Sequence, residues 1–157
     1  MTAVDDLYRT IVLEHGKRPR HRGPVAGATH AAEGDNPLCG DAMRVELALA
    51  HGRIAALGFT GESCAVATAS ASLMSERLRD CTPTDASRLT DAMEALCATG
   101  APGDAATART LGDLLAFGGV HRHPVRVSCA LLAWRVLRRA LGDAAAARNL
   151  TRAARGR

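Results

Sequence analysis

The sequence is poor in aromatic residues and contains no long hydrophobic run. Its 157 residues include one tyrosine, two phenylalanines and one tryptophan. Proteins that bind single-stranded nucleic acid stack bases on aromatic side chains, so the composition disfavours this class. No apolar stretch approaches the roughly 20 residues that a membrane-spanning helix needs. The first residues are acidic and lack the basic start and apolar middle of a signal peptide. We therefore expect a cytoplasmic protein without a membrane partner.

The net charge of +4 originates at the C-terminal end of the chain. Seven arginines and one aspartate follow Trp134, so the rest of the sequence is slightly acidic. A basic segment of this kind is more often a solvated face, or a docking surface for an acidic protein, than a reader of nucleic acid. We expect a single domain over residues 1–142, a basic C-terminal helix or tail over residues 143–157, and no nucleic-acid partner.

A β-hairpin is the clearest local pattern. Between residues 42 and 49 apolar and small or polar residues alternate, which is typical of a half-buried strand. His51-Gly52 forms a short turn, and residues 53–59 return as the partner strand. Residues 17–36 are expected to form a loop or a weak strand, because glycine and proline interrupt them.

Helical patterns dominate the remaining sequence. Thr82-Pro83-Thr84-Asp85 combines a capping hydroxyl, a proline in the first turn and a carboxylate three residues later, which is typical of a helix start. We expect helices from Asp5 or Asp6 to about Gly16 (burying Leu7, Ile11, Val12 and Leu13), from Cys64 to about Asp80, from Thr82 through Cys97, around Leu111–Leu115, and from Val127 to Leu141. The predicted fold class is α+β, with a small antiparallel β-sheet of about three strands packed against several helices.

The five cysteines point to metal binding or thiol chemistry. Cysteines in a cytoplasmic protein stay reduced, so a framework of disulfides is unlikely. An odd number of cysteines would also leave at least one thiol unpaired. Cys39 and Asp41 offer a thiolate and a carboxylate two positions apart, which zinc accepts as ligands. Cys64 and Cys129 each lie near a helix start, where the helix dipole lowers a thiol pKa. Arg126, three residues before Cys129, is expected to lower that pKa further.

Other interpretations of these residues stay open at this point. Each of the three cysteines is also a small residue of a type often found in protein cores. Cys81, in a loop, and Cys97, on an apolar helix stripe, are expected to be structural. His121 and His123 are alternative ligands in a nearby glycine-rich loop.

Four blocks of the sequence form a specific combination. They are Leu7 to Arg20, Asn36-Pro37-Leu38-Cys39-Gly40-Asp41, Phe59 to Met74, and Gly119 to Trp134. Together they resemble the IscU/NifU N-terminal family of iron–sulfur cluster assembly scaffolds, and within it the SufU branch. Ser128 stands before the last cysteine, where IscU-type proteins have a histidine, and the stretch around residues 82–106 resembles the SufU insertion.

The resemblance implies a metal centre formed by Cys39, Asp41, Cys64 and Cys129. It implies that zinc is bound by the three thiolates and the carboxylate. The resemblance further implies that a PLP-dependent cysteine desulfurase of the SufS type docks on the protein. One histidine of the desulfurase then replaces a cysteine as a zinc ligand, and the freed cysteine takes sulfur as a persulfide. We assign that cysteine, the catalytic residue, to Cys39, with Cys129 as the second candidate. Downstream SUF assembly proteins are the expected further partners.

Two alternative functions remain. The same residues would suit a scaffold that assembles and transfers a transient [2Fe–2S] cluster, because thiolates bind iron–sulfur clusters as well as zinc. A purely structural zinc site would use the same ligands without exchange. Whether the protein is an enzyme, a zinc-dependent sulfurtransferase acting with a cysteine desulfurase, is left open.

Overall fold

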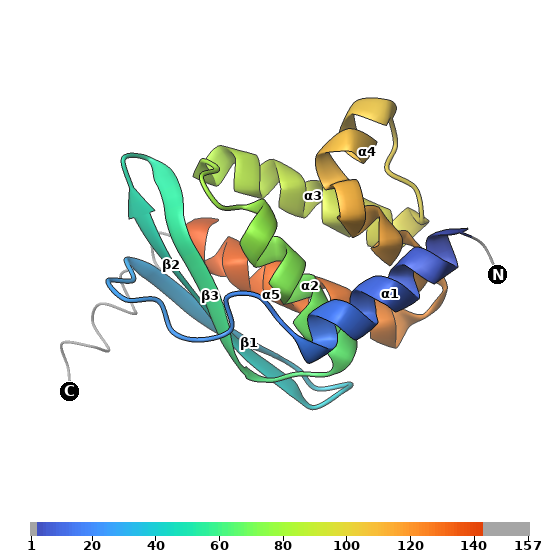
Figure 1. The fold of residues 1–157 in the computed structure, drawn as a ribbon, viewed down its shortest axis with the longest axis horizontal. Helices are drawn as coiled ribbons and strands as arrows, with labels where there is room; N and C mark the ends of the chain where they lie inside the picture. The colour runs from blue at the N-terminus through green and yellow to red at the C-terminus, as the bar shows by residue number, and fades with distance from the viewer. Residues whose placement is uncertain (1–2, 143–157) are drawn as a thin grey trace.

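The computed structural model describes residues 3–142 (Figure 1), and residues 1–2 and 143–157 lie outside this range. The predicted basic C-terminal helix or tail therefore lies outside the described residues and stays a prediction. In chain order the elements are α1 (Ala3–Lys17), β1 (His30–Asn36), β2 (Asp41–Ala50), β3 (Arg53–Glu62), α2 (Ala65–Arg77), α3 (Pro83–Thr99), α4 (Ala105–Leu111), the 3₁₀ helix η1 (Gly112–Arg122) and α5 (Pro124–Gly142).

The three strands form one antiparallel sheet in the order β1-β2-β3. Strand β2 pairs along its length with β3, and a register shift between Ala48 and Leu49 interrupts the ladder. Alternate residues of β2 are buried, which is the period expected when one face of a sheet covers a core. The predicted hairpin and the α+β class are confirmed.

The helices lie on the buried face of the sheet (Figure 1). Helix α5 packs against β1 and β2, while α2 contacts both α5 and β3. Helices α1 and α3 then pack against this inner pair, and η1 lies between them. The largest fully buried side chains are Trp134, Phe59 and Phe117. Trp134 donates its indole N–H to the Ser70 hydroxyl, which itself donates to the Ala130 carbonyl, so α2 and α5 are joined by buried hydrogen bonds.

The local predictions hold in part. The segment before the hairpin, expected to be a loop or a weak strand, ends in β1, which completes the predicted sheet of about three strands by pairing with β2, although its residues have a low intrinsic strand preference. On α1, Ile11 is buried, but Leu7 and Leu13 are exposed, so its buried face is narrower than predicted. The start of α3 is confirmed: Thr82 and Asp85 form a reciprocal capping box.

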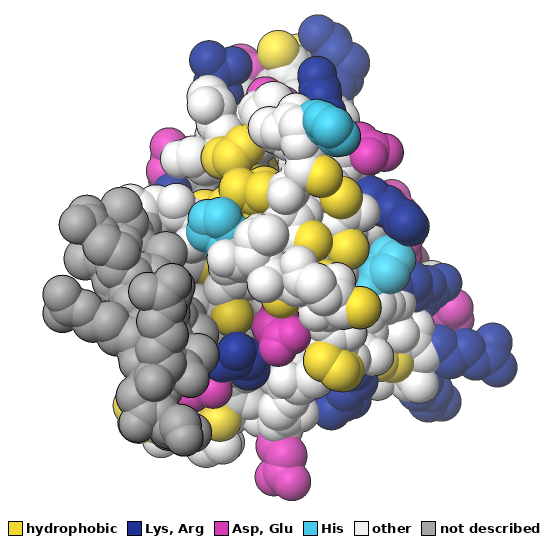
Figure 2. Space-filling model, turned by 90° about the vertical axis from the view of Figure 1, so that its left-hand side faces the viewer, with side chains coloured by type: hydrophobic (Ala, Val, Ile, Leu, Met, Phe, Trp, Pro, Cys, Tyr) yellow, Lys and Arg dark blue, Asp and Glu magenta, His cyan; other side chains and the backbone are white. Residues whose placement is uncertain are grey.

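The outer surface of the described residues carries charges of both signs. Figure 2 shows the side of the molecule at the left of Figure 1, with basic side chains around the rim, acidic ones between them and small hydrophobic patches toward the centre. None of the helices within residues 3–142 is both long and apolar enough to cross a bilayer.

Candidate metal centre

The predicted site residues come from three separate segments of the chain. Cys39 lies in the turn between β1 and β2, and Asp41 is the first residue of β2. Cys64 is the N-cap of α2, and Cys129 lies in the second turn of α5. The Cys39 side chain is exposed, Cys64 is partly buried and Cys129 is buried. The solvent exposure of the three thiols therefore decreases from Cys39 to Cys64 to Cys129.

The turn that carries Cys39 is fixed by Asn36 and Gly40. The Asn36 carbonyl accepts the amide N–H groups of Cys39 at 3.1 Å and Gly40 at 2.9 Å. Gly40 has φ +73°, a left-handed conformation that a residue with a side chain rarely adopts. This turn reverses the chain so that the Cys39 and Asp41 side chains both reach α5.

Two of the thiols are in contact. The Sγ atoms of Cys39 and Cys129 lie 2.9 Å apart. The buried Asn36 side chain donates to both sulfurs, at 3.5 Å to Cys39 and 3.6 Å to Cys129. The Asn36 amide therefore holds the two sulfurs side by side.

Asp41 connects this pair to Cys64. Its Oδ1 accepts the backbone N–H of Cys64 at 2.9 Å. Its Oδ2 is inaccessible to solvent and has no hydrogen-bond partner among the described residues. One ligand atom from each of Cys39, Asp41 and Cys129 lies within 4.8 Å of the others. Cys64 falls outside this tight group, although its backbone is held by Asp41.

The pKa of the Cys129 thiol is raised, chiefly by burial and then by interactions with the Cys39 and Cys64 side chains. The expectation of a lowered pKa at Cys129 is therefore wrong: burial first, and the neighbouring thiols second, raise this pKa, and the Arg126 side chain is exposed. The positive charge of Arg126 acts instead on Tyr8, whose pKa it lowers against the larger effect of burial.

The remaining cysteines and histidines lie away from the group. Cys97 is fully buried, and burial raises its pKa to about 12, as expected for a structural thiol. Cys81 donates its thiol to the Arg77 carbonyl at the end of α2. His121 bonds through Nδ1 to the Gly118 carbonyl and packs against Gly100. Neither His121 nor His123 belongs to the cluster found within the described residues.

The sequence predictions did not single out two residues of this region. Asn36 was recognised only as part of a turn, although an amide three residues before a cysteine can reach its sulfur. Tyr8 lies in α1, and the charges of Cys64 and Cys129 contribute to its raised pKa. No spacing in the sequence connects Tyr8 to either cysteine.

The residues present fit a metal ion. Thiolates and one carboxylate oxygen are ligands that zinc accepts, and thiolates also hold iron–sulfur clusters. Oδ2 of Asp41 is buried and has no partner among the described residues, and burial has made the nearby Cys129 thiol hard to ionise. Both features are costly for the polypeptide alone. A cation would remove both costs.

Comparisons with known proteins identify relatives of this chain. A family model described as the NifU-like N terminal domain matches residues 7–130. The chain is 30% identical over 96% of its length to the iron–sulfur cluster assembly scaffold protein IscU of Streptococcus pyogenes serotype M1, covering 92% of that protein. It is 31% identical over 85% of its length to the zinc-dependent sulfurtransferase SufU of Bacillus subtilis (strain 168), covering 88% of it.

A solved structure shares the fold. The crystal structure of a protein assigned as an iron–sulfur cluster assembly scaffold for the SUF system, from Fervidobacterium islandicum AW-1, superposes with a TM-score of 0.78. It is 28% identical in sequence, and the match covers 87% of this chain and 97% of that one. The arrangement of one small sheet and its helices is therefore that of known assembly proteins.

Proposed function

Since the chain belongs to the NifU-like N-terminal domain family, with relatives named IscU and SufU, we propose that it is a SufU-type iron–sulfur cluster assembly protein. In this proposal it binds zinc and accepts persulfide sulfur from a PLP-dependent cysteine desulfurase. Cys39, Asp41, Cys64 and Cys129 would hold the metal. Zinc, when bound, would keep its thiol ligands deprotonated at neutral pH.

One observation carries the proposal: a carboxylate oxygen of Asp41 lies within 4.8 Å of the sulfurs of Cys39 and Cys129, and Oδ2 of this buried carboxylate has no hydrogen-bond partner among the described residues. Carboxylate ligation distinguishes this group from an all-thiolate structural site, because a carboxylate binds a soft metal less strongly than a thiolate does. A site with one weaker ligand can exchange ligands more readily. The geometry thus favours a site that reacts over one that only stabilises the fold.

Cys39 is the thiol best placed to react. It is exposed, whereas Cys129 is buried. In the transfer step the Cys39 thiolate attacks the terminal sulfur of the desulfurase persulfide. A new S–S bond forms at Cys39, the S–S bond on the desulfurase breaks, and the desulfurase cysteine leaves as a thiolate. The products are a Cys39 persulfide and a regenerated desulfurase thiol.

The first test is the metal content of the purified protein. We expect about one zinc per chain, the number one four-residue site holds, and no visible absorption. Iron accompanied by visible charge-transfer absorption would instead support a scaffold that assembles a [2Fe–2S] cluster. Absence of both metals would contradict the proposed site.

The second test is the substitution Cys39→Ser. We expect the variant to keep its circular dichroism spectrum, because Cys39 lies in an exposed turn. Incubated with a cysteine desulfurase and cysteine, it should take up no sulfur, as measured by mass spectrometry of the intact chain. Cys81→Ser is the matched control and should take up sulfur normally. Normal uptake by Cys39→Ser, with the persulfide located on Cys129, would reassign the acceptor.

A further inference from the structure

The proposed function leaves the side chain of Asn36 unexplained. Asn36 is the last residue of β1, and only 5% of it is exposed. Its Nδ2 donates to the sulfurs of Cys39 and Cys129, at 3.5 Å and 3.6 Å. Its Oδ1 accepts the backbone N–H of Leu38 at 3.2 Å. The amide therefore uses its oxygen within the turn and its nitrogen on the two sulfurs.

The hydrogen bond from Leu38 fixes which end of the amide faces the sulfurs. A backbone N–H only donates, so the atom that it meets must be the amide oxygen. The NH₂ group then faces the sulfurs, and it carries two hydrogens, one for each sulfur. A side chain with a single donor could not bond to both sulfurs at once.

The turn by itself does not require asparagine at this position. Aspartate forms the same kind of turn, because its carboxylate oxygen also accepts a backbone N–H two residues later. The backbone carbonyl of Asn36, which accepts the N–H groups of Cys39 and Gly40, does not depend on the side chain. An aspartate would place an oxygen without a hydrogen against both sulfurs. The NH₂ group is thus the part of Asn36 that serves the sulfurs and not the turn.

The two contacts join an exposed thiol to a buried one. Cys39 lies in an exposed turn, whereas Cys129 lies in α5, 93 positions after Asn36. The two sulfurs are 2.9 Å apart. A cysteine in an exposed turn can rotate its side chain into solvent. The amide opposes that rotation, because it holds the Cys39 sulfur next to a sulfur that is fixed in a packed helix.

We propose that Asn36 is a positioning residue for the sulfur-accepting thiol, holding the Cys39 sulfur beside Cys129 with or without a bound metal. The inference rests on the function proposed above, and it names the group that keeps Cys39 at the site when another ligand replaces it on the metal. Groups that hydrogen-bond to metal ligands orient them, and losing such a group weakens metal binding by roughly 10–100-fold.

The test is Asn36→Asp in the full-length chain, because aspartate keeps the acceptor for Leu38 and removes both donors. Competition with a chromophoric chelator should show zinc affinity lower by about 10–100-fold. With Co²⁺ as a spectroscopic probe, the sulfur-to-cobalt charge-transfer bands should move to longer wavelength, since sulfur that loses a hydrogen bond gives up its electrons more easily. A folded variant with wild-type affinity and spectrum overturns the inference and leaves the proposed function intact.

Leu38→Asp is the matched control. It adds the same negative charge to the same turn, but from a side chain that is 66% exposed and with the backbone N–H retained. It should change neither the cobalt spectrum nor the zinc affinity by a comparable amount. Equal effects of the two substitutions would overturn the inference, because charge in the turn would then explain them.

Cross-linking of the metal-free protein tests the positioning without any metal. Diamide takes two electrons and two protons from a pair of thiols as their sulfurs form a disulfide, and peptide mass spectrometry identifies the pair. The Cys39–Cys129 disulfide should form roughly tenfold more slowly in Asn36→Asp than in the wild type, the order expected from losing one or two hydrogen bonds. An unchanged rate overturns the inference. If the wild-type chain binds neither Zn²⁺ nor Co²⁺, the proposed function fails, and this rate still decides the inference.

A further measurement uses the unaltered protein and does not depend on the folding of a variant. The chain contains two asparagines, Asn36 and Asn149, and no glutamine. A ¹⁵N-labelled sample therefore shows two side-chain NH₂ groups, and Asn149→Asp identifies the one that belongs to Asn36. Zinc should move both Asn36 proton resonances downfield, because metal-bound sulfur is a stronger acceptor than a thiol. Resonances that stay in place on stoichiometric zinc binding overturn the inference.

Discussion

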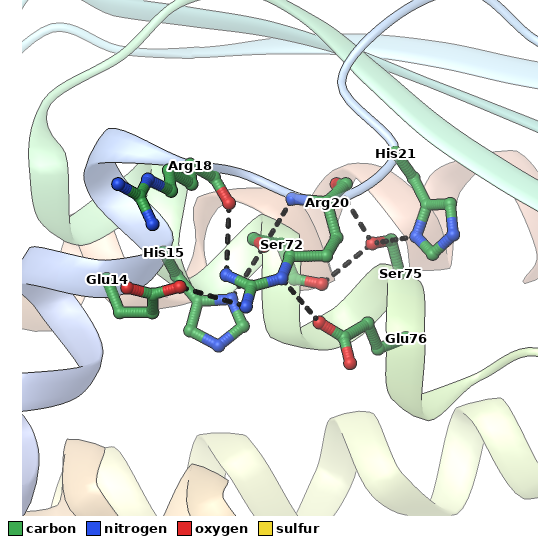
Figure 3. A network of polar contacts seen from close by, with 8 residues as sticks. All are labelled: Glu14, His15, Arg18, Arg20, His21, Ser72, Ser75 and Glu76. Atoms are coloured by element: carbon green, nitrogen blue, oxygen red, sulfur yellow. Dashed lines mark hydrogen bonds and ion pairs between the residues drawn. The ribbon is translucent and has the colours of Figure 1, made fainter.

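At the scale of single residues, burial decides the charge state of His15. His15 is buried, and its Nδ1 lies 2.7 Å from the Ser72 hydroxyl (Figure 3). The same hydroxyl oxygen accepts the Arg20 backbone N–H at 2.8 Å. Either tautomer of the neutral His15 ring can pair with this hydroxyl. Burial first, and the Arg20 charge second, lower the pKa of His15.

This predicts a stability loss on acidification. The folded state disfavours the charged imidazole, so the unfolded chain binds a proton first, near the ordinary histidine pKa of about 6.5. The stabilising contribution is complete above that pH and falls as the pH drops through the lowered pKa of the folded state. In His15→Asn, which keeps an acceptor near the position of Nδ1 but cannot titrate, the free energy of unfolding should depend less on pH below 6.5.

Urea denaturation between pH 7.5 and 5 measures this dependence. His51→Asn is the control, since His51 is exposed in the hairpin turn with φ +53°, a conformation that asparagine tolerates. It should leave the pH dependence unchanged. Identical pH profiles for wild type and His15→Asn would show that His15 does not carry the effect.

At the scale of secondary-structure elements, side-chain hydrogen bonds attach the segment after α1 to α2. Ser72 bonds to His15 and to the Arg20 backbone, and one turn later Ser75 bonds to His21 and to the Arg20 carbonyl (Figure 3). The Arg20 side chain adds ion pairs to Glu14 and Glu76. These ion pairs are partly exposed and contribute little, so the buried serines provide most of the attachment.

Ser72→Ala should therefore lower the free energy of unfolding by roughly 1–3 kcal/mol, because it leaves the His15 ring nitrogen and the Arg20 N–H without their partner. The comparison variant is Ser87→Ala, which removes an exposed hydroxyl from α3. It should change stability by less than about 0.5 kcal/mol. Urea unfolding of both variants at pH 7.5 distinguishes this bond from a general effect of serine removal.

The elements that the sequence predicted well are those with strong local patterns. The alternation in β2 and the Thr82 cap of α3 each depend on a few adjacent residues, and both appear in the structure. Strand β1 depends on pairing with β2, and η1 depends on packing between α1 and α3. Such elements are fixed by distant contacts, which a single sequence does not display.

At the scale of the whole molecule, the candidate site joins segments that are far apart in the chain. Cys39 and Cys129 are 90 positions apart, and their sulfurs lie 2.9 Å from each other. The local sequence around each cysteine predicted a thiol that can ionise or bind a metal. Only the resemblance to a family suggested that the three cysteines converge. Neither approach identified the Asn36 amide, whose contact with both sulfurs only coordinates reveal.

A metal bound at this junction should stabilise the entire domain. It would connect the β1–β2 turn, the start of β2, the N-cap of α2 and the second turn of α5. A ligand that binds only the folded state adds about 2.7 kcal/mol when its free concentration is 100 times its Kd. Removing zinc with a chelator should therefore lower Tm by on the order of 5–10 °C, as measured by differential scanning calorimetry, and adding zinc back should restore it.

Variants separate this effect from nonspecific damage by the chelator. Cys81→Ser should lose as much Tm as the wild type on zinc removal, because Cys81 lies outside the cluster and bonds to the end of α2. Cys129→Ser should start at a lower Tm and respond little to the chelator, since it lacks the buried ligand that joins α5 to the strands. A zinc-containing wild-type protein whose Tm is insensitive to the chelator would place its metal elsewhere, because an ion bound at this junction cannot be removed without releasing three segments of the fold.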